Sequence, residues 1–316
     1  MRIEDFLSEF DKAKKRVHVI GTSEAAVIIA LDMEGRIFTV LNGEVINKIN
    51  TDAINGQSTL ENYLNPGGDA LWPAPEGTTL GYQYSTGSWR VSPAISAARY
   101  LVTESTDKSV VIMAEIDLVN NQGLGFPTIF KRSVYIQPGQ DVISVSVTES
   151  ITYIGDRIVT RSECSLAPWS LCQLNCGPGC NVVFPCVDKS HVWSLYENEI
   201  GRELIWENNQ CCVLTEGTNR FQVGISEKVP YIEFFDPVNG WRVKRESSGV
   251  SPYESYIDIR DVQPTIVPDS RGVRYSVYND NNRFMEIEAV GGCPEIIQKG
   301  TEMNVRIITT FAKFKT

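Results

Sequence analysis

The 316-residue chain has only two histidines, His18 and His191. It is also short of positive charge: 29 lysines and arginines stand against 39 aspartates and glutamates, giving a net charge of −10. An acidic chain without a run of basic residues is poorly suited to duplex DNA or an anionic membrane surface. We therefore expect neither nucleic acid nor membrane as a partner.

Long apolar runs are missing as well. The longest, AAVIIAL at residues 25–31, is far shorter than the roughly 20 residues that cross a bilayer. Residues 1–16 alternate charged and apolar side chains and lack the apolar core of a signal peptide. These features predict a cytoplasmic protein, whereas a leader removed before residue 1 would place it in the periplasm or outside the cell.

Several common functional motifs are absent from the sequence. It contains no phosphate-binding Walker loop, no dinucleotide-binding glycine triplet, no nucleophile elbow and no HExxH zinc motif. We therefore expect no cofactor and no metal ion. The sequence carries no signal for an oligomeric state.

Cysteine, by contrast, is unusually dense, with seven of the eight cysteines between residues 164 and 212. Their spacing fits neither the paired knuckles of a structural zinc site nor an iron–sulfur motif. Buried free thiols are the favoured interpretation, because cysteine packs well as a small apolar side chain. A disulfide between Cys176 and Cys180 or Cys186, and a metal site, are the alternatives.

The apolar pattern predicts an all-β protein with a short N-terminal helix. Spacings of three and four residues between Ile3 and Phe10 indicate an amphipathic helix, and a second helix is predicted at Ser58–Leu64. Elsewhere short strands alternate with turn signals, which is typical of one large antiparallel β-sandwich. We expect residues 1–15 to form a helical appendage and residues 16–316 a single β domain. The predicted strands are Val17–Ile20, Ala26–Leu31, Ile37–Leu41, Ser109–Leu118, Thr128–Gln137, Asp141–Tyr153, Cys211–Leu214, Phe221–Ile225, Tyr231–Asp236, Trp241–Lys244, Tyr253–Ile259, Arg274–Tyr278, Phe284–Ala289 and Val305–Phe311.

The segment NPGGDALWPAPEG, residues 65–77, is the most informative part of the chain. Its paired glycines permit unusual backbone conformations, and the prolines after them favour an extended chain. We interpret it as a rigid loop that presents Trp72 with Asp69 and Glu76. Sugars stack their C–H faces on aromatic rings and pair their hydroxyls with carboxylates, so these residue types suit a sugar site. The alternative is a structural loop whose tryptophan closes one end of the sandwich.

This segment, followed by STGSWRVSPA at residues 85–94, resembles the loop of aldose-1-epimerase-like proteins. Its GG…LWPAP pattern is similar to an uncharacterised bacterial branch of the galactose-mutarotase-like superfamily. Later segments resemble strands of that branch in the same order: residues 128–135 (TIFKRSVY), 165–174 (SLAPWSLCQL) and 284–300 (FMEIEAVGGCPEIIQKG). The resemblance implies a large antiparallel supersandwich with a carbohydrate cleft on one concave face.

Mutarotases of this fold open and reclose a hexose ring with two histidines and a glutamate, and this sequence departs from that set. Asp69 stands directly after the glycine pair, where the branch usually has a histidine. In the family, the strand corresponding to residues 149–158 carries the histidine that acts as the general acid. Here that strand offers Arg157 among its polar residues instead. The two-histidine mechanism is therefore not expected.

The predicted catalytic residues are carboxylates: Glu288, Asp69 and Glu286. Glu286 and Glu288 share one face of a strand because side chains at i and i+2 point the same way. Glu288 lies nearest the position of the family's glutamate. The alternative is a solvent-facing strand with two ordinary acidic residues.

Aromatic and basic side chains complete the predicted site. Arg132 suits a carboxylate or phosphate on a sugar, but such an arginine also forms cross-strand ion pairs. Trp169 is flanked by apolar residues and fits the core better than a ligand platform. The predicted ligand-binding residues are Trp72, Glu76, Trp89, Arg132, Arg157 and His191.

Together these features predict a protein that binds or processes a small or polymeric carbohydrate without the two-histidine mechanism. Whether it is an enzyme stays open at this point, an aldose-1-epimerase-like isomerase being the activity the resemblance implies. The alternative is a structural or interaction protein that holds a polysaccharide or a protein segment on its concave face.

Overall fold

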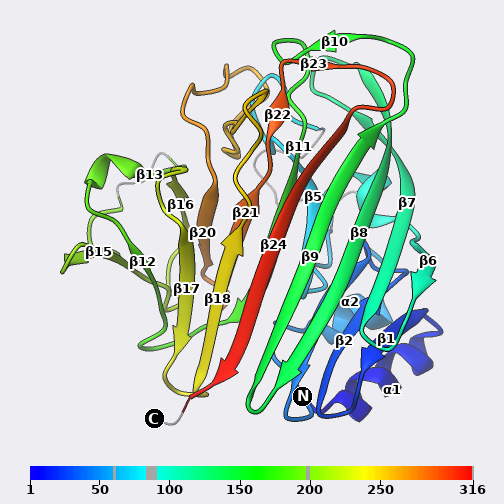
Figure 1. The fold of residues 1–316 in the computed structure, drawn as a ribbon, viewed down its shortest axis with the longest axis vertical. Coiled ribbons are helices and arrows are strands. Elements are labelled where there is room, and N and C mark those ends of the chain that lie inside the picture. The colour runs from blue at the N-terminus through cyan, green and yellow to red at the C-terminus, as the bar shows by residue number, and fades with distance from the viewer. Residues whose placement is uncertain (60–61, 83–90, 197–199, 315–316) are drawn as a thin grey trace.

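The computed structural model describes residues 1–59, 62–82, 91–196 and 200–314. Two large antiparallel sheets dominate it and pack face to face (Figure 1). In the view of Figure 1 the long strands of the second sheet cross the front of the molecule, and strands of the first sheet run behind them. The predicted all-β sandwich is confirmed.

The first sheet holds the central strands behind the front layer. Its spatial order is β1 (Val17–Gly21), β2 (Ala25–Ala30), β3 (Arg36–Leu41), β5 (Asp69–Ala74), β11 (Ala167–Asn175), β21 (Phe284–Val290), β20 (Tyr275–Asp280), β16 (Phe221–Ile225) and β13 (Val192–Ser194), with β4 (Glu44–Val45) paired to β3. Its middle strands are buried along their full length, so both faces of this sheet are covered.

The second sheet contains the longest strands. Its order is β14 (Leu204–Glu207), β15 (Gln210–Leu214), β12 (Asn181–Pro185), β17 (Tyr231–Asp236), β18 (Trp241–Ser247), β24 (Glu302–Lys313), β9 (Val142–Tyr153), β8 (Gly125–Gly139), β7 (Ser109–Val119) and β6 (Leu101–Ser105). Burial alternates residue by residue along β7, β8 and β24, as expected for a sheet with one face on the core and one toward solvent.

Short elements complete the fold. Two small ladders pair β10 (Val159–Thr160) with β23 (Ile296–Ile297) and β19 (Glu254–Ser255) with β22 (Cys293–Pro294). The helices are α1 (Ile3–Ala13), α2 (Thr51–Asn55), α3 (Pro93–Ser96) and a 3₁₀ turn at Lys189–His191. None of the helices within the described residues combines the length and apolarity needed to cross a membrane.

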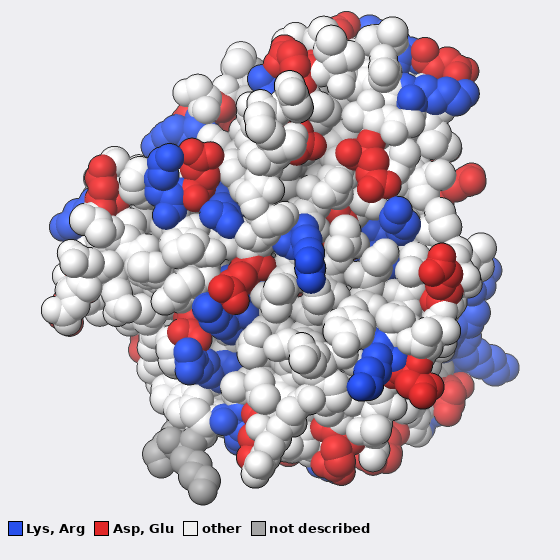
Figure 2. Space-filling model, viewed as in Figure 1, with Lys and Arg blue, Asp and Glu red and all other residues white. Residues whose placement is uncertain are grey.

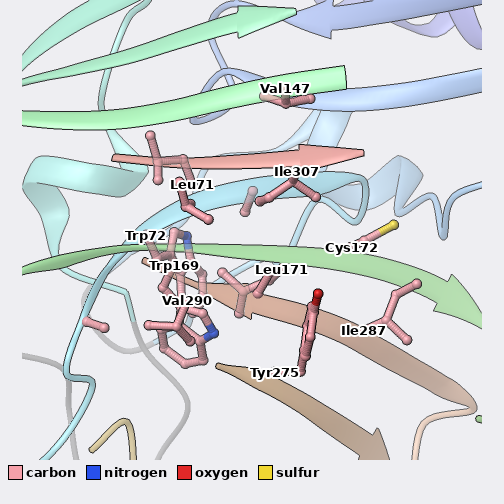
Figure 3. Close-up of a cluster of buried hydrophobic side chains, with 14 of the residues drawn as sticks. Leu71, Trp72, Val147, Trp169, Leu171, Cys172, Tyr275, Ile287, Val290 and Ile307 are labelled. Atoms are coloured by element: carbon pink, nitrogen blue, oxygen red, sulfur yellow. The ribbon is translucent and has the colours of Figure 1, made fainter. Parts of the chain in front are cut away.

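The apolar core has two parts. The larger fills the space between the sheets, where Leu71, Val147 and Ile307 lie together (Figure 3). The smaller lies on the outer face of the first sheet, where α1 packs Phe6 against Phe38 of β3 with ring centroids 4.8 Å apart. The first sheet therefore has an inner face toward the second sheet and an outer face that is also covered.

Most predicted strands lie within a residue or two of the observed ones, and the helix predicted near Ile3–Phe10 is present as α1. The interpretation of residues 65–77 as a loop is wrong, since Asp69–Ala74 is the buried central strand β5. The helix predicted at Ser58–Leu64 is absent from the described residues of that stretch, and a short helix forms just before it at Thr51–Asn55.

Surface charge and cysteines can be compared directly with the sequence. On the face shown in Figure 2 acidic and basic side chains are interspersed, and neither sign forms an extended patch.

All eight cysteines are free thiols, and six of them are buried. Burial raises the pKa of Cys172 and of Cys293 to about 12, so these thiols are protonated at neutral pH.

Candidate functional site

The pairing of β5 with β11 determines which side chains share a face of the first sheet. Asp69 lies opposite Cys172 and Trp72 lies opposite Trp169 in the antiparallel register. Because side chains alternate along a strand, Asp69 and Trp72, three residues apart, point to opposite faces. Asp69 points to the inner face and Trp72 to the outer one.

A buried ion-pair network occupies the inner face. Arg132 of β8 donates to Asp69 Oδ1 at 2.8 Å and to Glu149 Oε2 of β9 at 2.9 Å, and Arg245 of β18 donates to Asp69 Oδ2 at 2.7 Å. Both arginine side chains and Glu149 are completely buried. Ser170 of β11 donates to Asp69 as well. The network, with two cations and two carboxyl groups, ties the first sheet to the second.

Electrostatics in this network favour ionisation of Asp69. Burial opposes its charge, but Arg245 and Arg132 outweigh that penalty and lower the pKa of Asp69 below its usual range. Burial raises the pKa of Glu149, although Arg132 acts in the opposite direction.

The outer face carries a very small cavity of about 10 Å³, which is about the room that one water molecule needs. Five neighbouring strands of the first sheet contribute to its wall, and the order β16–β20–β21 places Gln222, Tyr278 and Glu286 in one row. The residues that line the cavity are Trp72, Glu76, Trp169, Leu171, Tyr196, Gln222, Tyr278, Glu286 and Glu288.

Trp72 and Trp169 form one aromatic corner of the cavity. Their ring centroids are 6.2 Å apart with an edge-to-face angle of 79°, an arrangement aromatic pairs favour. Figure 3 shows the two indoles close together beside β11, with Val290 next to them. Each indole N–H donates to a buried carboxylate: Trp72 to Glu34 at 3.1 Å and Trp169 to Glu288 at 3.0 Å. These bonds fix the orientation of both rings.

A second group of polar side chains, Glu34, Arg36 and Tyr63, surrounds Trp72. Glu34 accepts from Arg36 Nη2 at 2.8 Å and from the Tyr63 hydroxyl at 2.8 Å as well as from Trp72. The Arg36 guanidinium also lies over the Trp72 ring, 5.5 Å from its centroid. The buried charge of Glu34 is thus paired, and the tryptophan is fixed in its place.

Two adjacent carboxyl groups form the polar wall of the cavity. Glu288 accepts from the Gln222 amide at 3.2 Å and from Trp169, while Glu286 accepts from Gln173 at 2.7 Å. Burial raises the pKa of Glu288 to about 7, and the hydrogen bonds it accepts limit that rise. Burial and the neighbouring Glu288 raise the pKa of Glu286 well above its usual range. At neutral pH Glu288 is therefore partly ionised.

Glu76 supplies a third carboxyl group, just beyond the end of β5. It is only 6% exposed, and within the described residues nothing hydrogen-bonds to its carboxyl group. Burial, reinforced by Asp261, raises the pKa of Glu76 well above its usual range, while Arg220 opposes the shift. Arg220 itself lies 3.6 Å from Asp261 and donates to the Tyr278 hydroxyl at 3.0 Å. The cavity thus combines one carboxyl group whose pKa is raised well above its usual range, Glu76, with one whose pKa is about 7, Glu288.

Comparison with known proteins identifies the family. Residues 4–239 match a family of unknown function, DUF6786. The chain belongs to this family. No curated protein matches its sequence.

Solved structures share the fold of this DUF6786 chain at very low sequence identity. A galactose mutarotase-like protein from Lactobacillus casei ATCC 334 has 10% identity and a TM-score of 0.59, over 94% of this chain and 100% of its own. A galactose mutarotase-like protein from Clostridium acetobutylicum has 11% identity and a TM-score of 0.54, over 94% and 95%. A galactose mutarotase related enzyme from Lactobacillus acidophilus has 10% identity and a TM-score of 0.52, over 95% and 100%. The expected resemblance to this superfamily is confirmed for the fold.

The structure divides the predicted site residues into groups. Trp72, Glu76, Glu286 and Glu288 line one cavity, and the two glutamates of β21 are buried instead of facing solvent. The other predicted members lie elsewhere.

Asp69 and Arg132 do not reach this cavity, because both belong to the network on the inner face. Arg132 forms the cross-strand ion pair with Glu149 that was the alternative interpretation. Arg157 is exposed and pairs with Glu163 at 3.1 Å. His191 lies in the 3₁₀ turn before β13 and does not line the cavity. Trp89 lies outside the described residues.

Sequence reasoning missed several residues of the cavity wall. Trp169 was assigned to the core, and it is indeed 1% exposed, yet it also lines the cavity. Gln222 and Tyr278 lie on strands that were predicted correctly, but their shared face depends on the strand order β16–β20–β21. Tyr196 follows β13 and carries no sequence signal that distinguishes it.

Proposed function

We propose that the chain binds a single sugar ring at the cavity on the outer face of the first sheet and exchanges its anomers with carboxyl groups in place of histidines. The observation that carries this proposal is Glu288, a buried carboxyl group with a pKa of about 7 that shares the cavity with two tryptophans. A general base is most effective when its pKa lies near the working pH.

The lining of the cavity favours a sugar. At about 10 Å³ the cavity admits one water-sized group, so a hydroxyl of the sugar enters it while the ring lies at its mouth. The indoles of Trp72 and Trp169 offer apolar surface for the C–H face of a sugar. The fold supports the same class of ligand, since its structural neighbours include mutarotase-like proteins.

The proposed reaction needs one base and one acid on the same ring. The ionised Glu288 removes the proton from the anomeric hydroxyl, and the protonated Glu76 donates a proton to the ring oxygen. The bond between C1 and the ring oxygen breaks as the C1 carbonyl forms, so charge and protons balance. Rotation of the open aldehyde and the reverse transfers then close the ring to the other anomer.

Anomer exchange followed by NMR saturation transfer tests this function directly. Hexoses, hexuronates and hexosamines should be screened, and at least one is expected to exchange faster with wild-type protein. Glu288→Gln should lower kcat at least about 100-fold, the usual contribution of general acid–base catalysis, with little change in KM. The wild-type rate should rise with pH toward 7 as Glu288 ionises.

Glu295→Gln is the matched control, because Glu295 is exposed and pairs only with Arg161 at the surface. It should leave the rate unchanged. Absence of acceleration for every sugar, or an equal rate in Glu288→Gln, would overturn the enzymatic proposal. Binding of polysaccharide without any binding of single sugars would favour the interaction protein instead.

A further inference from the structure

The cavity gathers carboxyl groups without a cation in its described lining. Glu76, Glu286 and Glu288 all line it, and none of the nine described lining residues is a lysine or an arginine. A buried carboxylate is normally paired with a cation or held by several hydrogen bonds. In this respect the cavity differs from the network around Asp69, where each carboxyl group contacts a guanidinium.

Cations near the cavity are largely committed to other partners. Arg36 is paired with Glu34 at 2.8 Å, and Arg220 lies beside Asp261. Lys48 interacts electrostatically with Glu286, but its ammonium lies 4.5 Å from the Phe284 ring centroid, and burial lowers the pKa of Lys48. Within the described part of the chain, no lysine or arginine therefore forms an ion pair with Glu76 or Glu288.

An independent feature also indicates a missing hydrogen-bond donor. Gln222 is 2% exposed and its amide nitrogen donates to both oxygens of Glu288, which fixes the orientation of the amide. The amide oxygen is then left without a hydrogen-bond partner within the described part of the chain. A buried acceptor of this kind needs a donor, and native structures satisfy nearly all such atoms.

The remaining walls are aromatic. Trp72, Trp169, Tyr196 and Tyr278 line the same cavity. Aromatic faces attract cations through their quadrupole, and aromatic cages are a common way to recognise ammonium groups. Arg36 already lies over Trp72, and Arg220 lies over Tyr196 and Tyr278. The carboxyl groups and the unpaired amide oxygen are therefore the features that favour a positively charged donor.

We infer that the ligand of this cavity is an amino sugar whose ammonium group lies beside Glu288 and the Gln222 amide oxygen. The inference rests on the proposed sugar-binding function. A compact metal ion fits less well, because the described residues provide no group of three acidic, histidine or cysteine side chains arranged around one point. An ammonium group donates three hydrogen bonds and also neutralises the excess of carboxyl groups.

Isothermal titration calorimetry at pH 6.5 tests the inference, since amines of the α-amino type, with pKa values of about 7.7–8.0, are charged there. Three hexosamines should be compared with their parent hexoses and their N-acetyl derivatives. At least one hexosamine is expected to bind about tenfold or more tightly than both of its relatives. Measurements in two buffers of different ionisation enthalpy should show proton release, because the ammonium lowers the carboxyl pKa values.

Gln222→Met, which removes the unpartnered amide oxygen, should reduce the preference for the amine to less than threefold, and Glu295→Gln should leave that preference unchanged. Neutral sugars that bind as tightly as hexosamines would overturn the amino-sugar inference and leave the proposed function standing. Failure of every sugar to bind would overturn the proposed function and, with it, this inference.

Discussion

The two faces of the first sheet both bury carboxyl groups, with opposite consequences. On the inner face Asp69 contacts Arg132 and Arg245, and its pKa is lowered. On the outer face Glu288 is equally buried but receives hydrogen bonds from the neutral Trp169 and Gln222, and its pKa is raised to about 7. The direction of a pKa shift thus depends on the balance between burial and neighbouring charge: two guanidiniums lower the pKa of Asp69, whereas burial outweighs Arg132 at Glu149.

This difference separates a structural cluster from a candidate chemical site. The inner network joins β5, β8, β9 and β18, so its charges hold the two sheets in register. The cavity places its carboxyl groups next to empty space, where a ligand can exchange protons with them. A single strand, β5, contributes Asp69 to the first and Trp72 to the second.

The largest expected effect comes from breaking the inner network. Arg245→Met removes one of the two guanidiniums and leaves Asp69 buried with less compensation. Removal of one partner from a buried ion pair typically costs about 3–5 kcal/mol, so the free energy of unfolding should fall by that order. Urea denaturation followed by circular dichroism measures it.

Arg157→Met is the matched control for this variant, because Arg157 forms an exposed ion pair with Glu163. Surface pairs contribute only about 0–1 kcal/mol, so its stability should stay near that of wild type. Equal losses in the two variants would mean that the inner network is not a special source of stability.

A smaller effect on the free energy of unfolding is expected from Glu288 in the cavity, and this effect depends on pH. The pKa of Glu288 is about 7 in the folded protein against an ordinary value of 4.5, so between these pH values the folded state holds a proton that the unfolded state has released. Its contribution to stability, roughly 3 kcal/mol in total, is thus complete below about pH 4.5 and is lost as pH rises through 7.

Glu288→Gln should remove this loss. Urea denaturation at pH 5, 6, 7 and 8 is the measurement, and the stability of the variant is expected to decline less than that of wild type across the range. Parallel curves for the two proteins would show that Glu288 titrates at its ordinary pKa and that the two faces do not differ in this way.

The fold could largely be predicted from the sequence because period-two alternation is strong in the long strands. Asp141–Tyr153 alternates clearly, and β9 begins one residue later. The central strand β5 was missed because a strand buried on both faces does not alternate, and DALWPA contains a proline that normally disfavours the middle of a sheet. Burial on both faces depends on what covers the sheet, and the sequence of the strand does not contain that information.

The site could be predicted only in part, for a related reason. The i, i+2 spacing correctly placed Glu286 and Glu288 on one face. Asp69 and Trp72 were joined in one site because they share a short segment, but their odd spacing in a strand separates them. Arg132 meets Asp69 through a contact between sheets, and Gln222 meets Glu288 through strand order, which local sequence does not specify.

The most direct test of the difference between the two faces is the titration of Glu288 itself. Protein labelled with ¹³C at the glutamate side-chain carboxyl carbon should be titrated by NMR between pH 4 and 9, with Glu288→Gln used to assign the resonance. The structure predicts a carboxyl signal that titrates near pH 7 and is missing from the variant. A spectrum in which the signal lost in Glu288→Gln titrates near pH 4.5 would contradict it.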